Sequence, residues 1–395
     1  MVIVHERFTE LGGSEQVVGH LASLTANSRV FAPIVDQDRL PPTLNPDRLS
    51  SSFLQGMYCR SGRYAHLLPL LPLAMSGADL SDADVVVTSH HAFANRVRVP
   101  PEVPIISYTH SPARWMWDPA KRRGESGGPL GALAIGAFAA TARRPDRAAA
   151  NRIDIVVANS RTVARRIRRW WGRSSVVIHP PVDVDFYTPG DGRRQDFFLL
   201  AGRLVPYKRA EVAISAANRL GCRLVVAGDG RTRASLEALA GPTVELLGQV
   251  SDADLRGLYR SCAALLFPGE EDFGIVPVEA QGCGAPVIAH GAGGATETVI
   301  DGGTGHLVPP DRDDPVGALC RAMVSHDPGR YDPAVIRENA EQFSVDLFVD
   351  RFDRLLGDCV DGWQSGSRSL DPLRGPEPTD LDQAERLVSP RSRPS

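Results

Sequence analysis

The chain has 395 residues, a length that suits two α/β domains with sizeable cores. Its formal net charge is -3 and its sequence pI is about 6.4, so no strongly basic surface field points to nucleic acid as a partner. The apolar run at residues 67–75 is interrupted by Pro69 and Pro72 and is too short to span a membrane.

The cysteines are scattered, without a C-x-x-C pair and without a signal peptide ahead of them, so we expect free thiols and a cytoplasmic protein rather than a disulfide framework. The cysteines are Cys59, Cys222, Cys262, Cys283, Cys320 and Cys359.

The N-terminal half begins with a short apolar strand at residues 2–4, a loop over 5–13 and a helix from Ser14. Later strands are expected at residues 84–88, 104–107, 154–158 and 175–178. The Pro/Asp-rich segment that follows ends this pattern. We therefore predict an N-terminal domain over 1–180 and an interdomain linker over 181–196.

The second half alternates strands with helices, which predicts a parallel sheet in a second domain over 197–342. A helix over 343–360 is expected to pack back on the N-terminal domain. Residues 361–395 contain few large apolar side chains and are expected to be disordered. The expected strands lie at 197–201, 223–227, 243–247, 263–267 and 286–289, and the expected helices at 208–220, 231–239 and 252–262.

Residues 267–297 contain the most informative pattern of the chain. Glu271 lies in the loop after a buried strand, eight residues before Glu279, which we expect in the first turn of a helix opened by Pro277. A glycine-rich turn follows. Ligands of open α/β sheets bind at the carboxyl ends of the strands, so the two carboxylates are expected to face one ligand site.

A second pattern is the loop GRLVPYKR at residues 202–209, between a strand and a helix. Free N–H groups at such a junction suit a phosphate. Lys208 is one of only two lysines, with Lys121, among 44 basic residues. The alternative is a surface helix start with solvated cations.

The third pattern is YTHSP at residues 108–112, which places His110 just past a strand end, within reach of a cleft. The alternative is a histidine that stabilises the Ser-Pro turn through a local hydrogen bond. Gly12 and Gly13 open the first long helix and either let a ligand approach the backbone or cap the helix.

The string P-x-x-E-x-F-G-x-x-x-x-E-A from residue 268, with a later G-G-A-x-E, resembles the retaining, nucleotide-sugar-dependent glycosyltransferases of the GT-B fold that carry a Glu-x7-Glu motif (family four). The resemblance covers about residues 1–355. The string Y-x-H-S-P-x-R-x-x-W-D from Tyr108 to Asp118 is similar to that of bacterial mannosyltransferases of surface polysaccharide assembly. The resemblance implies an α/β fold of two Rossmann-like domains with the active site in the cleft between them.

The resemblance also assigns roles to single residues. It implies that Arg203 and Lys208 bind the donor diphosphate, that His110 contacts the donor sugar, that Glu271 holds sugar hydroxyls and that Glu279 accepts from the ribose hydroxyls. It implies donor contacts at Gly12, Gly13, Phe273 and Gly274, the last two through their backbone, and we expect the loop at Gln249 and Val250 to contact the base. This chain departs from the family pattern at Asp272, where a glycine often stands.

Other patterns receive structural interpretations. The Asp-x-Asp pairs at residues 82/84 and 252/254 look like helix starts capped by Ser81 and Ser251, and the pair at 183/185 falls in the linker, so no metal site is predicted. The run RRIRRWW at 165–171 either covers the core with its tryptophans or docks on an anionic bilayer. Gly228-Asp229-Gly230 does not complete a dinucleotide fingerprint, because Arg233 stands at the third glycine position.

These patterns predict a cytoplasmic enzyme, with the inner face of the cell membrane as an alternative location. The predicted reaction moves a hexosyl or N-acetylhexosaminyl unit from a UDP- or GDP-sugar to a saccharide, lipid-linked or small-molecule acceptor, without metal or cofactor. The alternatives are a nucleotide-sugar 2-epimerase of the same architecture and a catalytically silent binding module.

Overall fold

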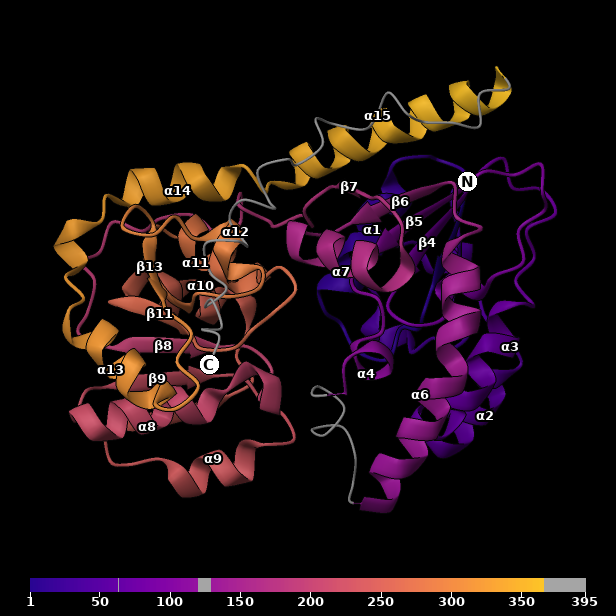
Figure 1. The fold of residues 1–395 in the computed structure, drawn as a ribbon. Helices are drawn as coiled ribbons and strands as arrows, with labels where there is room; N and C mark the ends of the chain where they lie inside the picture. Colours follow the sequence, from indigo (N-terminus) through magenta and orange to yellow (C-terminus); the bar gives the residue numbers. More distant parts are fainter. Residues whose placement is uncertain (63, 120–128, 366–395) are drawn as a thin grey trace, which may run out of the picture.

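The computed structural model describes residues 1–62, 64–119 and 129–365. Two domains lie side by side, each built on a sheet with helices packed against it (Figure 1). The strand order is β3-β2-β1-β4-β5-β6-β7 in the N-terminal domain and β10-β9-β8-β11-β12-β13 in the C-terminal domain. Within the described residues every pair of neighbouring strands is parallel. The predicted α/β class with two Rossmann-like domains is confirmed.

The N-terminal sheet contains five strands at the predicted places and two that the sequence did not reveal, β2 and β3. These two are only three and two residues long, so they show no apolar pattern that a strand prediction could use. The strands are β1 (Val2–His5), β2 (Arg29–Phe31), β3 (Leu49–Ser50), β4 (Val86–His90), β5 (Ile105–Thr109), β6 (Ile155–Ala158) and β7 (Val176–Val177). The helices are α1 (Gly13–Ser23), α2 (Leu54–Ser61), α3 (Leu71–Met75), α4 (Arg114–Trp117), α6 (Pro129–Ala150) and α7 (Arg161–Trp171).

The C-terminal domain follows the predicted alternation, with boundaries shifted by one or two residues. The helix expected from Lys208 begins at Ala210, because Pro206–Lys208 forms a 3-10 turn before it. The strands are β8 (Phe198–Ala201), β9 (Leu224–Ala227), β10 (Val244–Gly248), β11 (Ala264–Phe267), β12 (Val287–His290) and β13 (Gly305–Val308). The helices are α8 (Ala210–Leu220), α9 (Arg233–Leu239), α10 (Asp252–Ser261), α11 (Ile275–Gly282), α12 (Ala295–Thr298), α13 (Pro315–Val324), α14 (Pro333–Glu341) and α15 (Val345–Gln364).

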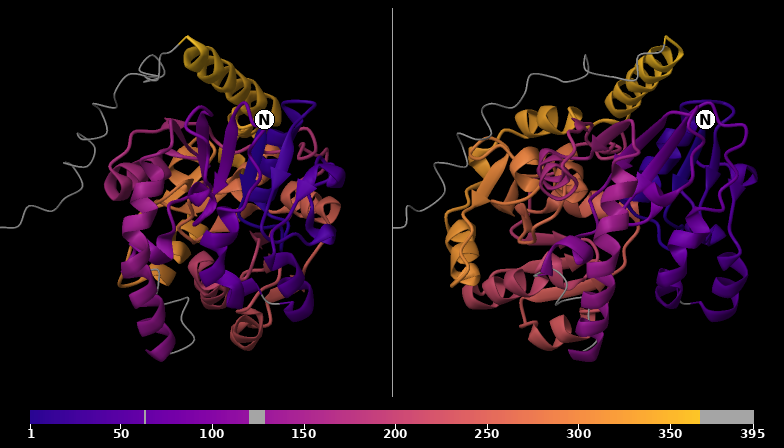
Figure 2. Two further views of the ribbon diagram at one scale, coloured as in Figure 1. Left: turned by 90° about the vertical axis from the view of Figure 1, so that its right-hand side faces the viewer. Right: turned by 45° about the vertical axis from the view of Figure 1, so that its right-hand side comes forward.

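The last helix, α15, leaves the C-terminal domain and lies along the N-terminal domain in all three ribbon views (Figures 1 and 2). Its Phe348 and Phe352 are buried in the same apolar cluster as Ile3 and Val87 of the N-terminal sheet. The helix continues to Gln364, so the prediction of disorder from residue 361 is wrong for its first residues. The expected tail from residue 366 lies outside the described residues.

The strand orders define where ligands can bind. In each sheet the first strand lies inside the sheet. The following strands are added on one side of it, and the chain then crosses to the other side, so the strand order reverses between β1 and β4 and between β8 and β11. Crevices at the carboxyl ends of strands next to such a reversal are the usual ligand sites of open α/β sheets. The loops after β1, β4, β8 and β11 are therefore the first places to look for function.

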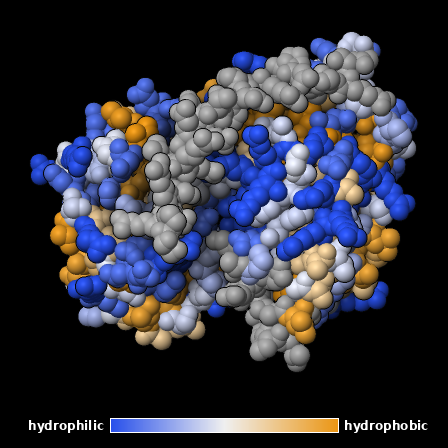
Figure 3. Space-filling model, in the orientation of Figure 1, coloured by the Kyte–Doolittle hydropathy of each residue, from blue (hydrophilic) through white to orange (hydrophobic). Residues whose placement is uncertain are grey.

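The described residues on the face of the molecule seen in Figure 3 form no large apolar patch. Hydrophilic residues cover most of the face seen in Figure 3, and hydrophobic residues are scattered in small groups over both domains. None of the helices in the described part of the chain combines the length and the apolar composition needed to cross a bilayer.

Candidate active site

The loop after β8 brings Lys208 back over the sheet end. Gly202 has a φ of +119°, and a Cβ atom built there would lie 2.9 Å from the Nζ atom of Lys208, so the glycine makes room for the lysine. The Nζ atom lies 2.8 Å from Oε1 of Glu271, in the loop after β11. Burial disfavours the ammonium, but the Glu271 carboxylate raises the pKa of Lys208 above its ordinary value. The two predicted site residues are therefore in direct contact.

Arg203, from the same loop, reaches toward the other domain. Its guanidinium donates to the carboxylate of Glu10 over 2.5 Å, and Glu10 lies in the loop after β1. The side chain of Arg203 remains more than half exposed. Both cations predicted to bind a diphosphate thus have carboxylate partners in the unliganded chain.

The glycine-rich turn after β12 supports the Glu271 loop. The N–H of Gly294 donates to the carbonyl oxygen of Glu271 over 2.8 Å. A Cβ atom at Gly293 would lie 2.4 Å from that same oxygen, and one at Gly294 would lie 2.1 Å from the carbonyl oxygen of Phe273. Only glycine permits this close packing, so the turn fixes the backbone that presents Glu271.

Glu279 lies farther along α11 than expected. The helix begins at Ile275 after Gly274, whose φ is +93°, so Pro277 does not open it and Glu279 is beyond its first turn. The hydroxyl of Tyr259 donates to Oε2 of Glu279 over 2.9 Å. Burial, aided by the charges of Asp252 and Glu271, raises the pKa of Glu279 to about 7. Tyr259 is 20 residues away from Glu279, and no sequence pattern indicated this contact.

On the N-terminal side, His110 is buried just after β5. Its Nε2 lies 2.9 Å from Oγ of Ser89, at the end of β4, and its ring stacks on His91 with centroids 4.4 Å apart. Burial lowers the pKa of His110 well below its ordinary value, and the neighbouring histidines add to this. His110 is thus linked to the end of β4 through Ser89 and to the loop after β4 through His91, whereas the hydroxyl of Ser111 donates to the carbonyl of Pro112 within the turn.

The two glycines at the start of α1 differ in their surroundings. Gly12 caps the helix, and its N–H donates to the Glu15 carboxylate over 3.0 Å. Gly13 faces the other domain, since a Cβ atom there would lie 2.3 Å from Cδ1 of Ile275 on α11. This close approach brings the start of α1 to the start of α11.

The remaining predicted donor contacts lie in two loops of the C-terminal domain. Phe273 is 3% exposed, and its ring packs against His179 and Phe343, so only its backbone can face a ligand. Gln249 is exposed in the loop between β10 and α10, and Val250 is half-buried against the core beside it. These positions remain predictions for contact with sugar and base.

Sequence reasoning missed the contacts that join the two domains at the site. The carboxylate of Asp272 accepts from Arg166 and lies 3.4 Å from Arg114, both in the N-terminal domain. The hydroxyl of Ser160 donates to the carbonyl oxygen of Asp272 over 2.6 Å. The replacement of the family's glycine by Asp272 was visible in the sequence, but its arginine partners lie more than 100 residues away.

Glu297, the glutamate of the G-G-A-x-E string, makes a second interdomain contact. Its carboxylate accepts from the backbone N–H of Arg161 over 2.7 Å and of Thr162 over 2.8 Å, at the start of α7. It also bonds His179 over 3.2 Å. Burial opposes ionisation, yet these hydrogen bonds lower the pKa of Glu297 below its ordinary value.

The side patterns have structural roles. Trp171 is buried and its indole N–H donates to Asp146 over 2.7 Å. It therefore belongs to the core, which was one of the two interpretations of the run at 165–171. Ser251 caps α10 as expected. Ser81 caps no helix, because it lies in a turn where its hydroxyl donates to Asp79. Among the described residues no group of three His, Cys, Asp or Glu side chains is arranged to hold a metal ion.

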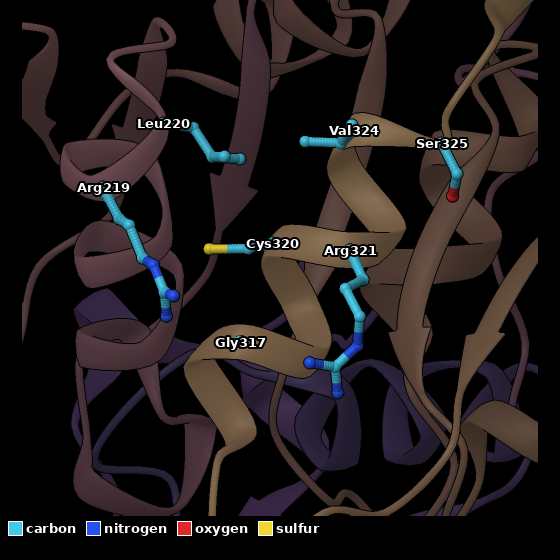
Figure 4. Close-up of a pocket in the computed structure, with 7 residues that line it drawn as sticks. All are labelled: Arg219, Leu220, Gly317, Cys320, Arg321, Val324 and Ser325. Carbon is cyan, nitrogen blue, oxygen red and sulfur yellow. The ribbon is translucent and has the colours of Figure 1, made fainter.

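A surface hollow between α8 and α13 contains none of the predicted site residues (Figure 4). Leu220 and the thiol of Cys320 face each other across it, with Arg219 and Arg321 at its side. It lies away from the carboxyl ends of the strands and is not part of the candidate site.

Each half of the chain matches a known glycosyltransferase family. Residues 11–186 match the family described as "Glycosyltransferase Family 4", and residues 189–343 match "Glycosyl transferases group 1". The chain is 34% identical over 180 residues to D-inositol 3-phosphate glycosyltransferase of Mycobacterium tuberculosis, a match that spans 39% of this chain and 38% of that protein.

Solved structures share the fold over nearly the whole chain. Sucrose-phosphate synthase of Thermosynechococcus elongatus superimposes with a TM-score of 0.70 at 18% identity and covers 91% of this chain and 99% of its own. Anabaena HepE in complex with UDP and glucose gives a TM-score of 0.65 at 18% identity, with 90% and 99% covered. None of the proteins named here is an epimerase, so that alternative gains no support.

Proposed function

We propose that this chain, whose fold is that of the GT-B glycosyltransferases, is a retaining glycosyltransferase. It transfers a hexosyl or N-acetylhexosaminyl unit from a UDP- or GDP-sugar to a hydroxyl of a saccharide, lipid-linked or small-molecule acceptor. A nucleotide-sugar donor is supported by Anabaena HepE, which binds UDP and glucose. All six cysteines are free thiols, which is consistent with a reducing cytoplasm.

The observation that carries the proposal is the contact between Lys208 and Glu271 at the strand reversal of the C-terminal sheet. A cation beside a helix start suits the diphosphate of a donor, and an adjacent carboxylate suits the hydroxyls of its sugar. Arg203 supplies a second cation from the same loop. Because each cation already has a carboxylate partner, an entering diphosphate replaces one anionic partner by another.

The chemistry follows from the charges that develop during transfer. Negative charge grows on the leaving diphosphate, and Lys208 and Arg203 stabilise it, each by about 3 kcal/mol in the transition state. In the front-side attack implied by the family, the leaving phosphate takes the acceptor proton and the anomeric configuration is retained. Glu271 holds the sugar hydroxyls, and Glu279 accepts from the ribose.

The proposed reaction needs no metal, because the two cations take the role that a metal ion has in other transferases. The positions of the Asp-x-Asp pairs support this. Asp252 and Asp254 belong to the first turn of α10, and Asp183 accepts from the N–H of Phe186 in the linker. Asp82 pairs with Arg29 at the surface.

A donor panel tests the proposal. UDP- and GDP-hexoses and N-acetylhexosamines are offered with saccharide and lipid-linked acceptors in excess EDTA, and release of nucleoside diphosphate and the anomeric configuration of the product are measured. We expect release with at least one donor and retention. Isomerisation of the sugar without an acceptor would indicate the epimerase instead. Activity lost in EDTA and rescued by manganese would contradict the metal-free site.

Lys208→Ala provides the matched loss-of-function variant. We expect turnover to fall by about two orders of magnitude, because a charge that stabilises the transition state is removed. Arg219→Ala, an exposed cation at the other end of α8, serves as the control and should leave turnover unchanged. Near-normal turnover of a folded Lys208→Ala protein would refute the assignment.

A further inference from the structure

A buried row of four polar side chains leads from α1 to His110. Nε2 of His5 lies 3.4 Å from Oε1 of Glu15, Nδ1 of His5 lies 3.0 Å from Oγ of Ser89, and this oxygen lies 2.9 Å from Nε2 of His110. His5 and Ser89 are fully buried, and Glu15 and His110 are 5% and 7% exposed. Side chains from β1, β4 and α1 thus hold the side chain of His110, which follows β5.

The end of the row at Glu15 can only accept hydrogen bonds. Burial opposes ionisation of this carboxyl, but hydrogen bonds led by that of His5 lower its pKa to about 2. The other carboxylate oxygen, Oε2, accepts from the N–H of Gly12 over 3.0 Å and from the hydroxyl of Ser14 over 2.9 Å. Oε1 therefore accepts from a proton on Nε2 of His5.

For a neutral His5 ring, a count of protons fixes the rest of the row. With one proton on His5, held at Nε2, its Nδ1 has only a lone pair and accepts from the hydroxyl of Ser89. That hydroxyl has a single proton, so its oxygen accepts the remaining bond, from a proton on Nε2 of His110. Burial lowers the pKa of His110 and keeps this ring neutral. Its Nδ1 is consequently left with a lone pair.

We propose that Glu15, His5 and Ser89 are positioning residues that hold His110 as the Nε2–H tautomer, so that its Nδ1 accepts a hydrogen bond from a hydroxyl of the bound sugar. This inference rests on the proposed function for the identity of the ligand. Nε2 is already engaged by Ser89, so Nδ1 is the ring nitrogen left for a ligand. The stacked ring of His91, tilted by 10° from that of His110, fixes the plane in which the lone pair lies.

The partners of Glu15 differ from those of Glu6, another buried carboxylate nearby. Glu6 accepts from the backbone N–H groups of Ala92, Phe93 and Ala94 over 2.8, 2.6 and 2.8 Å, which is a structural cap on the loop after β4. Glu15, in contrast, has one oxygen on the start of its own helix and the other on a histidine. Only the second oxygen sets a tautomer.

Glu15→Gln tests the row without changing its shape. The glutamine oxygen keeps the place that accepts from Gly12 and Ser14, since an amide NH2 there would face two donors. The NH2 group then faces His5 and donates to its Nε2. Nδ1 of His5 must now carry the proton and donate to Ser89, and Ser89 must donate to Nε2 of His110. The variant is therefore expected to invert the tautomer of His110 and leave its proton on Nδ1.

The measurement is 15N NMR of the full chain labelled in histidine, with the His110 signals assigned by their loss in His110→Gln. We expect the proton of His110 on Nε2 in the wild type and in Ser14→Ala, which retains the carboxylate, and on Nδ1 in Glu15→Gln. The same tautomer in wild type and Glu15→Gln would overturn the proposal. If Glu15→Gln does not fold, Ser89→Ala replaces it: both tautomers should then be present, and a pure Nε2–H form would overturn the proposal.

Activity separates this inference from the proposed function. Where the donor panel finds a substrate, we expect Glu15→Gln to lower kcat about tenfold with little change in the KM of the donor, because the sugar hydroxyl can no longer donate to Nδ1 and must reorient to accept from it as the anomeric carbon moves. An inverted tautomer with unchanged kcat would overturn the sugar contact. If the tautomer is inverted but the protein transfers no sugar, the proposed function would be refuted, whereas the role of the row in setting the His110 tautomer would stand.

Discussion

At the scale of single residues, Glu279 is a group of the site whose charge changes near neutral pH. Burial raises its pKa from 4.5 to about 7, so the folded chain holds the proton more tightly than the unfolded chain does. The stability that this group contributes is complete below about pH 4.5 and is lost as the pH rises through about 7. In the proposed site the ribose hydroxyls would donate to the Glu279 carboxylate, so a nucleotide should favour the ionised form.

Nucleotide binding is therefore expected to release a proton from Glu279 below its pKa of about 7. Calorimetric titration of UDP at about pH 6, in buffers that differ in ionisation enthalpy, measures this release. We expect more proton release in the wild type than in Glu279→Gln. The variant is the control, because protons released by the diphosphate itself are released in both proteins. Equal proton release from both proteins would show that the Glu279 carboxylate does not bind the ribose hydroxyls.

The sequence predicted the charged residues of the site better than their partners. Glu271, Lys208 and Arg203 stand in short strings whose chemistry is visible locally. Their surroundings come from distant parts of the chain: Glu10 reaches Arg203 across 193 positions, and Ser89 reaches His110 across 21. Contacts over such separations depend on the order of strands in the sheet, which the spacing of apolar residues does not determine.

At the scale of elements, the start of α7 is bound by the C-terminal domain. The carboxylate of Glu297 accepts from the first N–H groups of this helix, where the helix dipole favours an anion. Ser160, which caps the helix, also donates to the loop that contains Glu271 and Asp272. These contacts join the two domains beside the loop that contains Glu271.

Glu297→Ala is expected to open the cleft, because hydrogen bonds to a charged group contribute about 1.5–3 kcal/mol each. Small-angle X-ray scattering should show a larger radius of gyration than in the wild type. Glu338→Ala, which removes an exposed glutamate of α14, is the control and should scatter like the wild type. Identical scattering of Glu297→Ala and the control would contradict the role of this contact.

The elements themselves were predictable where the apolar pattern was regular. The strands β8, β9, β11 and β12 consist of four mostly buried residues each, and β10 is a partly exposed strand at the sheet edge; the sequence placed each of the five within one or two residues. The start of α11 was misplaced because Gly274, at a φ of +93°, begins the helix before Pro277. A proline in the first turn indicated a helix start but not its first residue.

At the scale of the whole molecule, the chain crosses between the domains twice. The linker leads from β7 to β8, and the segment between α14 and α15 leads back. The two crossings are joined, since the N–H of Val182 donates to the carbonyl of Phe343 over 2.9 Å. The C-terminal domain is therefore connected to the N-terminal domain at two adjacent points, which suits a hinge.

Phe352→Ala tests the second crossing. Phe352 is 0% exposed in the apolar cluster shared by α15 and the N-terminal sheet, and removal of a buried phenylalanine costs about 3–5 kcal/mol. We expect a clearly lower urea midpoint than in the wild type and in Asp353→Ala, the exposed neighbour on the same helix. An unchanged midpoint would mean that α15 is not part of the N-terminal core.

The central claim is that a nucleotide sugar lies across α11, with its ribose at Glu279 and its sugar at Glu271. Calorimetric titration of the nucleoside diphosphate into Glu279→Ala and Glu271→Ala tests this most directly. We predict that Glu279→Ala weakens binding by about 1–3 kcal/mol, because ribose hydroxyls lose their partner. Glu271→Ala should leave the affinity nearly unchanged, since the diphosphate carries no sugar to contact. Equal losses in both variants, or a loss only in Glu271→Ala, would contradict this placement of the donor.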